Sequence, residues 1–479
     1  MSGLFGVVAE KCCSQDLFYG TDYLSHMGTE FGGLAVIDNP SAPESRIYRK
    51  IRALNQGGQF KEKFSGDYAQ VKGQYGIGVI SDKDEQPVFL NTKFGPLAIC
   101  MAGLIENNSE LIRGLHAENV SFTETVEGHS NSTEIIGKLL TQAETLVEGI
   151  QKVFTQIKGS ASFLVLSREG VYAVRDRFGY VPLTVGKKDG GYAVTNEANS
   201  FANLGYEIEE ELEPGQVVLL TESGAKTLRE AAGGCSKICT FLWIYTGFPA
   251  SSYYGISAEK VRERSGAFLA KRDVIKADLV SGVPDSGTAH AIGYANESGV
   301  PYRRALTKYT PGYGRSYTPP TQELRDTVAK MKLIPIKDII DGNSVVICDD
   351  SIVRGTQLKN FTVQKLTENG ATEVHVRIAC PPLLFPCRFC LSTRTTNELV
   401  ARRAMDDIEG KEVDDVSDYT DCDNDKYKAL VEWIRKDLGV TSLQYQRIDD
   451  MVEAIGIPKE KLCTYCWNGE CPDGAIDTE

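Results

Sequence analysis

The pattern of apolar and polar residues predicts a buried strand over residues 345–348. Val345–Cys348 is an uninterrupted apolar run, and Asp349 and Asp350 follow it directly. A short apolar run bounded by acids and small residues is typical of a parallel strand covered on both faces in an α/β sheet. In the amino-terminal half, residues 147–157 repeat apolar side chains at helical spacing, which predicts a helix between two strand-like segments.

The loop after the predicted strand has the residues needed to bind a phosphorylated sugar. The backbone N–H groups of Ser351–Thr356, with the hydroxyls at both ends of this loop, can surround a phosphate at the start of the next helix. The two preceding acids can accept hydrogen bonds from a vicinal diol or help to hold a hydrated Mg²⁺. Because ligands of such sheets bind at the carboxyl ends of the strands, the combination suits a ribose 5-phosphate. The residues predicted to bind it are Asp349, Asp350, Ser351, Val353, Arg354, Gly355 and Thr356.

This strand and loop resemble the phosphoribosyl pyrophosphate (PRPP) signature of type I phosphoribosyltransferases. Val283–Gly287 is similar to the pyrophosphate loop of the same fold, in which small residues let the backbone approach a diphosphate. Its predicted contacts are Asp285, Ser286 and Gly287. Nearly continuous similarity from Cys239 to Gly469 is specific to one family, the glutamine PRPP amidotransferases (amidophosphoribosyltransferases). The resemblance implies an α/β phosphoribosyltransferase domain with a parallel sheet.

The same resemblance implies a transfer reaction at C1 of the ribose. An amine attacks C1 and expels pyrophosphate, so that positioning and charge stabilisation matter more than a nucleophilic side chain. Ser286, Asp349 and Asp350 occupy the positions that the family uses around Mg²⁺ and the ribose. Lys308 and Arg315 lie on the segment that, by resemblance, closes over the leaving group.

The amino-terminal half resembles the class II glutaminase domain of the same family. The frame Gly3–Val7 is intact, but Ser2 stands where the family has its catalytic cysteine. Later matches include Arg175, Asp176 and the turn Glu213–Gly215. The implied fold is a four-layer αββα sandwich of the N-terminal nucleophile hydrolase type, so that the whole chain combines α+β and α/β domains.

The residues with which that family binds glutamine are replaced in this sequence. The segment that carries the carboxylate-binding arginine reads Gly76–Ser81 and contains no arginine. Ala102 stands at the position of the oxyanion asparagine, and Ser132 at that of the aspartate that binds the amine. Buried charges need charged partners, and the loss of an oxyanion donor typically costs about 10² to 10³ in rate. An amino-terminal serine can act as a nucleophile in principle, but we expect Ser2 to be inactive.

The spacing of the cysteines predicts a metal site. Cys387 and Cys390 form one CxxC pair, and Cys463 and Cys466 form a second. Two such pairs suggest a structural Zn²⁺ held by four thiolates. One branch of the family instead carries a [4Fe-4S] cluster that ties the carboxyl-terminal tail to the catalytic domain, and its ligands match Cys239, Cys387, Cys463 and Cys466. Both assignments, and the absence of a metal, stay open at this point.

Length and composition limit the number of domains and the classes of ligand. The chain has 479 residues, enough for about two domains. We expect the boundary in the Ala- and Gly-rich segment 228–236, with a glutaminase-like domain over residues 1–230 and a transferase domain over 231–479. A net charge of −13 without a basic stretch argues against nucleic-acid binding. No apolar run has the length of a membrane span, and the acidic segment 406–425 is typical of a solvated surface.

Thirteen cysteines without a signal peptide indicate a reducing compartment, and we expect a cytoplasmic protein. The family further implies a homo-oligomer.

Three hypotheses follow for function. The first is an enzyme that makes 5-phosphoribosylamine and pyrophosphate from PRPP, with free ammonia as the amine, at the entry of purine biosynthesis. A separate glutaminase could supply the ammonia. The second is a catalytically silent regulator that binds PRPP or a nucleotide, and the third is a phosphoribosyltransferase with a different acceptor. A closing segment around Lys308 and Arg315 favours catalysis, because a sensor needs no lid.

Overall fold

The computed structural model describes the whole chain except residues 43–44, 55–58, 69, 127–128, 232, 234–235, 310–330, 391–392, 394, 473–474 and 477–479. The chain divides into two compact units. Unit 1 comprises Met1–Cys239, Arg388–Leu391 and Pro472–Glu479, and unit 2 comprises Thr240–Cys387 and Ser392–Cys471. The division into residues 1–230 and 231–479 stays a prediction.

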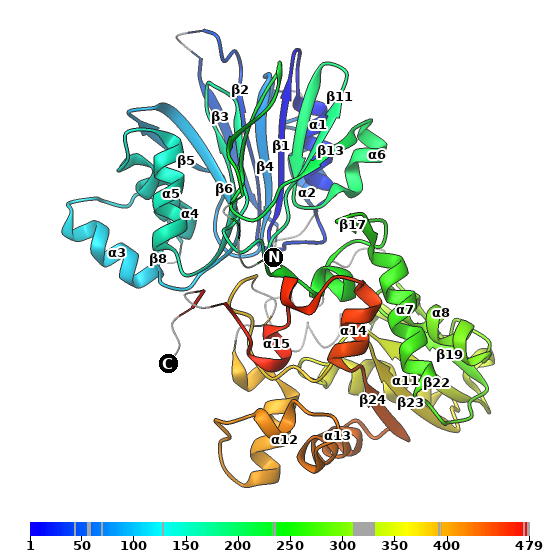
Figure 1. Ribbon diagram of the computed structural model, residues 1–479. Helices are drawn as coiled ribbons and strands as arrows, with labels where there is room; N and C mark the ends of the chain where they lie inside the picture. Colours follow the sequence, from blue (N-terminus) through cyan, green and yellow to red (C-terminus); the bar gives the residue numbers. More distant parts are fainter. Residues whose placement is uncertain are drawn as a thin grey trace. The chain divides into compact units, whose positions relative to one another are not determined.

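Unit 1 is built on two antiparallel sheets that pack face to face (Figure 1). The first, in spatial order, consists of β13 (Glu207–Glu211), β11 (Thr184–Lys188), β12 (Gly191–Thr195), β1 (Gly3–Ala9), β4 (Tyr75–Ser81), β2 (Phe31–Ile37) and β3 (Ile47–Ala53). The second consists of β15 (Gly224–Arg229), β14 (Val217–Thr221), β10 (Val171–Val174), β9 (Gly159–Leu166), β6 (Gly95–Ile105) and β5 (Val88–Thr92). The short strands β7 (Thr125–Val126), β8 (His129–Ser130) and β16 (Ile238–Cys239) complete the strands of this unit.

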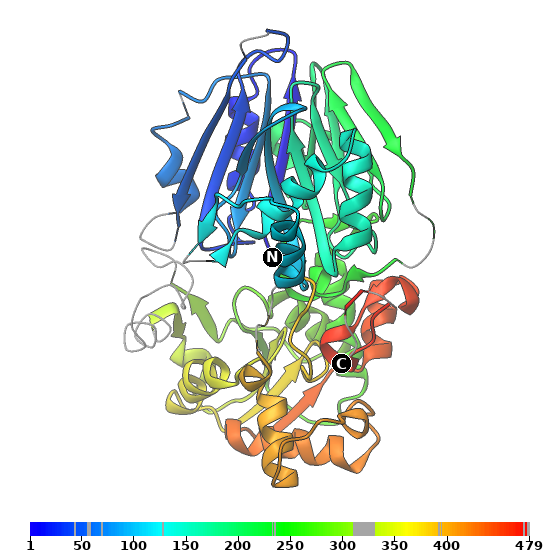
Figure 2. The same ribbon diagram turned by 90° about the vertical axis from the view of Figure 1, so that its left-hand side faces the viewer.

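Helices cover the outer face of each sheet, and the layer order is therefore αββα (Figure 2). One outer layer contains α1 (Ser14–Asp22), α2 (Phe60–Phe64) and α6 (Phe201–Leu204), and the other contains α3 (Asn108–Ala117), α4 (Ser132–Thr141) and α5 (Leu146–Gln156). The predicted helix over 147–157 is confirmed as α5, which begins at a capping box formed by Thr145 and Glu148. The predicted sandwich is confirmed.

Strand β1 lies in the interior of the first sheet, between β12 and β4. Phe5 is paired with Thr195 on one side and with Gly78 on the other. Asn196 fixes the start of the strand, because its side chain accepts from Leu4 N–H at 2.7 Å and donates to the Ser2 carbonyl at 3.0 Å. These bonds hold the backbone of Ser2 at the end of the sheet.

Unit 2 contains a parallel sheet in the order β19 (Leu279–Gly282), β22 (Ser344–Asp349), β23 (Glu373–Ile378) and β24 (Ser442–Tyr445). The strand predicted at Val345–Cys348 is confirmed as β22, and its first five residues are buried. Its other strands are β17 (Ser252–Tyr253), β18 (Ile256–Ser257), β20 (Leu306–Lys308), β21 (Leu333–Pro335) and β25 (Leu462–Cys463). Its helices include α7 (Ala258–Lys271), α8 (Thr288–Ser298), α10 (Lys337–Ile340), α11 (Gln364–Glu368), α12 (Val400–Glu409), α13 (Asp425–Leu438), α14 (Ile448–Ile455) and α15 (Tyr465–Asn468).

No helix among the residues described in this structure is long and apolar enough to cross a membrane.

Helices α7 and α8 cross at very short distance because glycines meet backbone at the contact. A Cβ atom on Gly266 would lie 1.9 Å from the carbonyl oxygen of His290, and one on Gly293 would lie 1.8 Å from that of Glu263. The crossing encloses His290, which is fully buried, with its Nε2 atom 3.2 Å from the carbonyl oxygen of Ile244. Burial lowers the pKa of His290 to about 3, and the nearby Arg262 guanidinium acts in the same direction.

We predict that unit 2 loses stability on acidification because of His290. The unfolded chain binds the proton with a pKa near the ordinary value of about 6.5, whereas the folded pKa is about 3. The stabilisation is therefore complete above about pH 6.5. It is lost progressively as the pH falls from there towards the folded pKa of about 3. Replacement of His290 by Gln should reduce the loss of stability between pH 7 and pH 5.

The three tryptophans of the chain, Trp243, Trp433 and Trp467, all lie in unit 2, so urea unfolding followed by their fluorescence reports on this unit. Equal losses of stability in His290→Gln and in the wild type would show that other groups cause the acid sensitivity.

Candidate functional site

The loop after β22 leaves a set of backbone donors open. None of the N–H groups of residues 351–355 donates a hydrogen bond to an acceptor within the described residues. Gly355 has a φ of +79°, in the left-handed region that glycine adopts without cost. Successive free N–H groups around such a residue form a concave anion site. The loop can thus surround a phosphate group.

The two acids at the end of β22 lie next to the second predicted loop. Because β19 and β22 are parallel neighbours, their carboxyl ends meet at one edge of the sheet. The Ser286 hydroxyl donates to Asp349 Oδ1 at 3.0 Å, and Ser351 donates to Asp350 Oδ2 at 2.6 Å. The structure therefore brings the predicted pyrophosphate loop and the predicted ribose site together.

The surroundings of Asp349 disfavour the negative charge of its carboxylate. Burial raises the pKa of its carboxyl group well above the usual range, and the adjacent Asp350 carboxylate raises it further. A cation between the two loops would remove this repulsion, and hard oxygen ligands of this kind suit Mg²⁺. The donor set Ser286, Asp349 and Asp350 fits that ion.

Lys308, at the end of β20, pairs with Asp285 at 2.9 Å. Gly287 packs closely against the end of β22, since a Cβ there would lie 2.1 Å from the carbonyl oxygen of Cys348. These contacts bring Lys308 to the pyrophosphate loop as well. Arg315, the other residue predicted on the closing segment, lies outside the described residues.

The side chain of Arg354 points to a partner that the sequence did not indicate. Its guanidinium donates to Glu398 Oε1 at 2.5 Å, and the side chain is exposed. The loop Ser351–Thr356, called the phosphate loop below, can therefore use the backbone N–H of Arg354. The positive charge of the Arg354 side chain is meanwhile paired with the Glu398 carboxylate. Glu398 is 44 residues away in the sequence, and no local pattern connects the two.

Unit 1 has a small cavity of about 20 Å³ at Ser2. Ser81, Gly103 and Ser132 line this cavity, and they lie in or next to the segments predicted to correspond to the family's glutamine site. Its lining residues are Ser2, Ser81, Lys83, Asp84, Gln86, Met101, Gly103, Leu104, Ile105 and Ser132. Sequence reasoning missed Lys83 and Asp84, which place opposite charges beside the cavity. The Asp84 carboxylate already accepts from the Ser132 N–H at 3.0 Å.

Three of the predicted metal-binding cysteines belong to unit 2. Leu384 and Phe385 both donate their N–H groups to the carbonyl oxygen of Cys466, which places the segment before Cys387 beside the second CxxC pair. The Thr240 hydroxyl, directly after Cys239, donates to the carbonyl oxygen of Cys463 at 2.7 Å.

Cys390, the competing fourth ligand, is buried and belongs to unit 1. Its neighbours are fixed there, since Phe389 stacks on Tyr180 with ring centroids 4.0 Å apart and Arg388 pairs with Glu106 at 2.6 Å.

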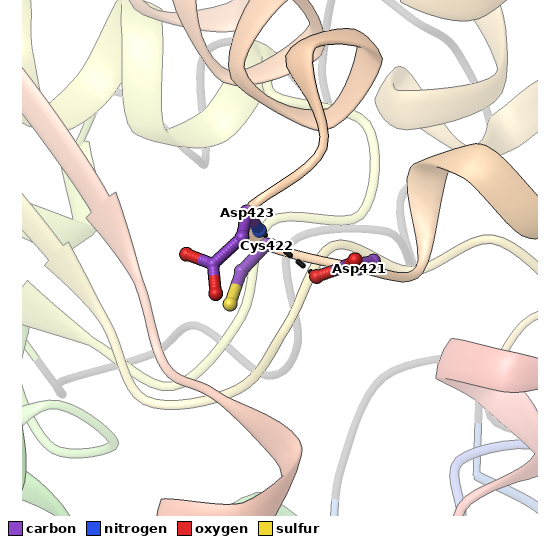
Figure 3. Close-up of side chains that lie close together, drawn as sticks. All are labelled: Asp421, Cys422 and Asp423. Atoms are coloured by element: carbon purple, nitrogen blue, oxygen red, sulfur yellow. Dashed lines mark hydrogen bonds between the residues drawn. The ribbon is translucent and has the colours of Figure 1, made fainter.

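Among the described residues, the only group of three or more potential metal ligands within 4.8 Å of one another is Asp421, Cys422 and Asp423 (Figure 3). The three are consecutive residues of one surface turn, in which Asp421 accepts the N–H of Asp423 at 2.9 Å. Asp423 also lies 3.8 Å from the guanidinium of Arg447. The turn belongs to the acidic segment expected to be solvated, and its acids are exposed.

Comparisons with known proteins find similarity over nearly the whole chain. A family model described as a glutamine amidotransferase domain matches residues 75–203. The amidophosphoribosyltransferase of Bacillus subtilis strain 168 is 30% identical over 486 residues, which cover 98% of this chain and 94% of the relative. That of Methanocaldococcus jannaschii is 29% identical over 499 residues, covering 98% of both chains.

Solved structures give the same result. The glutamine PRPP amidotransferase from B. subtilis, complexed with ADP and GMP, matches with a TM-score of 0.83 and 29% identity, over 98% of this chain and 97% of that one. The resemblance seen in the sequence and the fold class that it implied are confirmed. Similarity over nearly the whole length, with a parallel-sheet phosphoribosyltransferase unit and an amidotransferase sandwich, shows that this chain belongs to the amidophosphoribosyltransferase family of glycosyltransferases.

Proposed function

We propose that this chain forms 5-phosphoribosylamine and pyrophosphate from PRPP and free ammonia, as an enzyme of purine biosynthesis. The observation that carries the proposal is the contrast between the two sites. Unit 2 offers open backbone donors and paired acids for PRPP, whereas the Ser2 cavity of about 20 Å³ has room for about one water molecule. The residues that line this cavity include no arginine to hold a glutamine carboxylate.

The roles of the residues follow from their chemistry. The N–H groups of 351–356 bind the 5′-phosphate, and Asp349 and Asp350 bind the ribose hydroxyls and, with Ser286, the hydrated Mg²⁺. The ammonia lone pair forms the C1–N bond while the C1–O bond to pyrophosphate breaks, and the surplus proton leaves the ammonium product to solvent. Lys308 and Arg315 balance charge on the departing pyrophosphate. Bound Mg²⁺ would neutralise the pyrophosphate.

The loss of glutamine use is supported by three features of the Ser2 cavity. The hydroxyl of Ser2 is a weaker nucleophile than a cysteine thiolate. Asp84, the acid beside the cavity, is already hydrogen-bonded to the backbone of α4. The position of the oxyanion asparagine carries Ala102, which has no side-chain donor. Ammonia would then arrive from solvent or from a separate glutaminase.

We further propose that Cys387, Cys463 and Cys466, with Cys239 as the fourth ligand, hold a [4Fe-4S] cluster with a structural role. Within unit 2 the segments that carry three of these cysteines are joined, since Leu384 and Phe385 donate their N–H groups to the carbonyl oxygen of Cys466. Four thiolates on one Zn²⁺ must crowd around one centre about 2.3 Å from each sulfur, whereas a cluster receives one thiolate at each of its separate irons. Oligomeric state and cytoplasmic location stay predictions.

The first prediction concerns the amine donor. Pyrophosphate release from PRPP and Mg²⁺ should require ammonium chloride and should not occur with glutamine. Ser2→Ala should leave the ammonia-dependent rate unchanged within about twofold, because Ser2 belongs to unit 1 and makes no interaction in the transition state proposed for unit 2. Release with glutamine that disappears in Ser2→Ala would show a working glutaminase. No release with either donor would favour the binding regulator or another acceptor.

A second prediction tests the acids of the ribose site. Asp349→Asn should lower kcat/KM for PRPP by about 100-fold or more, because charge-assisted hydrogen bonds contribute about 1.5–3 kcal/mol each. Removing one of two adjacent carboxylates also relieves their repulsion, so the folded protein should not be destabilised. Thermal unfolding of the same variant checks this point. Unchanged turnover in Asp349→Asn would remove this residue from the site.

A third prediction separates the two metal assignments. Anaerobically purified protein should contain about four iron atoms and equivalent sulfide per chain, and little zinc. Cys466→Ser should lose both. Cys239→Ser should lose iron while Cys390→Ser keeps it. The reverse result for these two matched variants, together with zinc in the wild type, would establish the four-cysteine zinc site instead.

A further inference from the structure

The outer side of the phosphate loop is held by α12. The backbone N–H of Val400, the first residue of this helix, donates to the carbonyl oxygen of Val353 at 2.7 Å. One turn further along the helix, Arg403 donates from Nη2 to the carbonyl oxygen of Arg354 at 2.6 Å. Two successive carbonyl groups of the loop are thus fixed from the same side, by the same helix.

A planar peptide couples these bonds to the inner side of the loop. In a trans peptide the carbonyl oxygen and the N–H of the following residue point in opposite directions. The carbonyl of Val353 therefore sets the direction of the Arg354 N–H, and the carbonyl of Arg354 sets that of the Gly355 N–H. Both N–H groups belong to the set that has no acceptor within the described residues. A carbonyl held by α12 directs its peptide N–H towards the opposite side, where a phosphate binds.

The charge of Arg403 is less compensated than that of its neighbours. Arg354, Lys359 and Arg403 line a hollow of about 230 Å³ beside the loop. Arg354 pairs with Glu398 and Lys359 with Asp437, at 2.5 and 2.7 Å. Arg403 forms no ion pair with a carboxylate in the part of the chain that the structure describes. Its positive charge therefore adds to the field that the phosphate dianion meets at this loop.

We infer that Arg403 is a positioning residue for the 5′-phosphate of PRPP. It acts through the carbonyl of Arg354, which orients the Gly355 N–H, and it does not need to touch the sugar. The inference rests on the proposed function, since it takes PRPP as the ligand of this loop. It predicts an effect on the phosphate end of the ligand alone, because the pyrophosphate loop at Val283–Gly287 is a separate segment that begins after β19.

The test uses ribose 5-phosphate and Mg-pyrophosphate as separate probes of the two ends, each titrated into the full chain by calorimetry. Arg403→Ala should weaken ribose 5-phosphate binding about tenfold, because the Gly355 N–H loses its fixed orientation and a positive charge near the phosphate is removed. Pyrophosphate binding should not change. Arg403→Lys keeps the positive charge but lacks the planar guanidinium donor. Its affinity for ribose 5-phosphate should lie between those of the wild type and Arg403→Ala. In turnover, Arg403→Ala should raise the KM for PRPP and leave kcat nearly unchanged, because binding of the phosphate is uniform along the reaction.

Arg402→Ala is the matched control, because the neighbouring arginine on the same helix donates to the carbonyl oxygen of Val413 at 2.8 Å, away from the loop. It should bind both probes like the wild type. Arg403 is exposed, so its variants should fold, and Arg403→Gln provides a second neutral replacement with a donor.

Three results would overturn the inference: unchanged ribose 5-phosphate binding in Arg403→Ala, equal loss of both probes, or the same loss in Arg402→Ala. Failure of the wild type to bind ribose 5-phosphate would overturn the proposed function as well. Normal binding without turnover would overturn only the proposed catalysis.

Discussion

The two adjacent carboxylates at the end of β22 impose the constraint on which the chemistry of unit 2 depends. Asp349 and Asp350 are covalent neighbours at the edge of a buried strand, where burial and mutual repulsion disfavour two negative charges. Hydrogen-bond donors stabilise the negative charge of such a pair, and a bound cation would reduce the repulsion further. Ser286 and Ser351 provide donors from the two sides. The parallel pairing of β19 and β22 is what brings the first of these serines to the acids.

The phosphate loop also places polar groups where they need a ligand, and here the groups are backbone N–H donors. Open N–H groups attract an anion, but only when their peptide planes are fixed. The fixing groups lie outside the loop, on α12, which binds the carbonyls of Val353 and Arg354. The helix contributes no side chain to the inner surface of the loop in our assignment. Under this inference the contribution of α12 is to orient the N–H groups that would contact the phosphate.

The sandwich of unit 1 is built on two apolar cores. These cores lie between the helices and the sheets and include side chains such as Phe5, Leu17, Ile99 and Ile135. Met101 and Ile105 belong to one of the cores and also line the Ser2 cavity. The fold of this unit is evidence of its family, whereas its activity depends on a few side chains around Ser2.

The sequence by itself determined the elements and much of the transferase site. A short apolar run rich in β-branched residues and followed by acids indicates β22, because a strand covered on both faces accommodates such a run, and the helical repeat at 147–157 indicates α5. The loop residues are local in sequence, so their pattern was visible without a structure. The tertiary structure alone decided the contacts that join distant segments. Glu398 and Arg403 meet the phosphate loop, and Lys83 and Asp84 meet Ser2, at separations for which no sequence period exists. Such contacts arise from how helices and strands pack, and packing depends on the shape of the whole core.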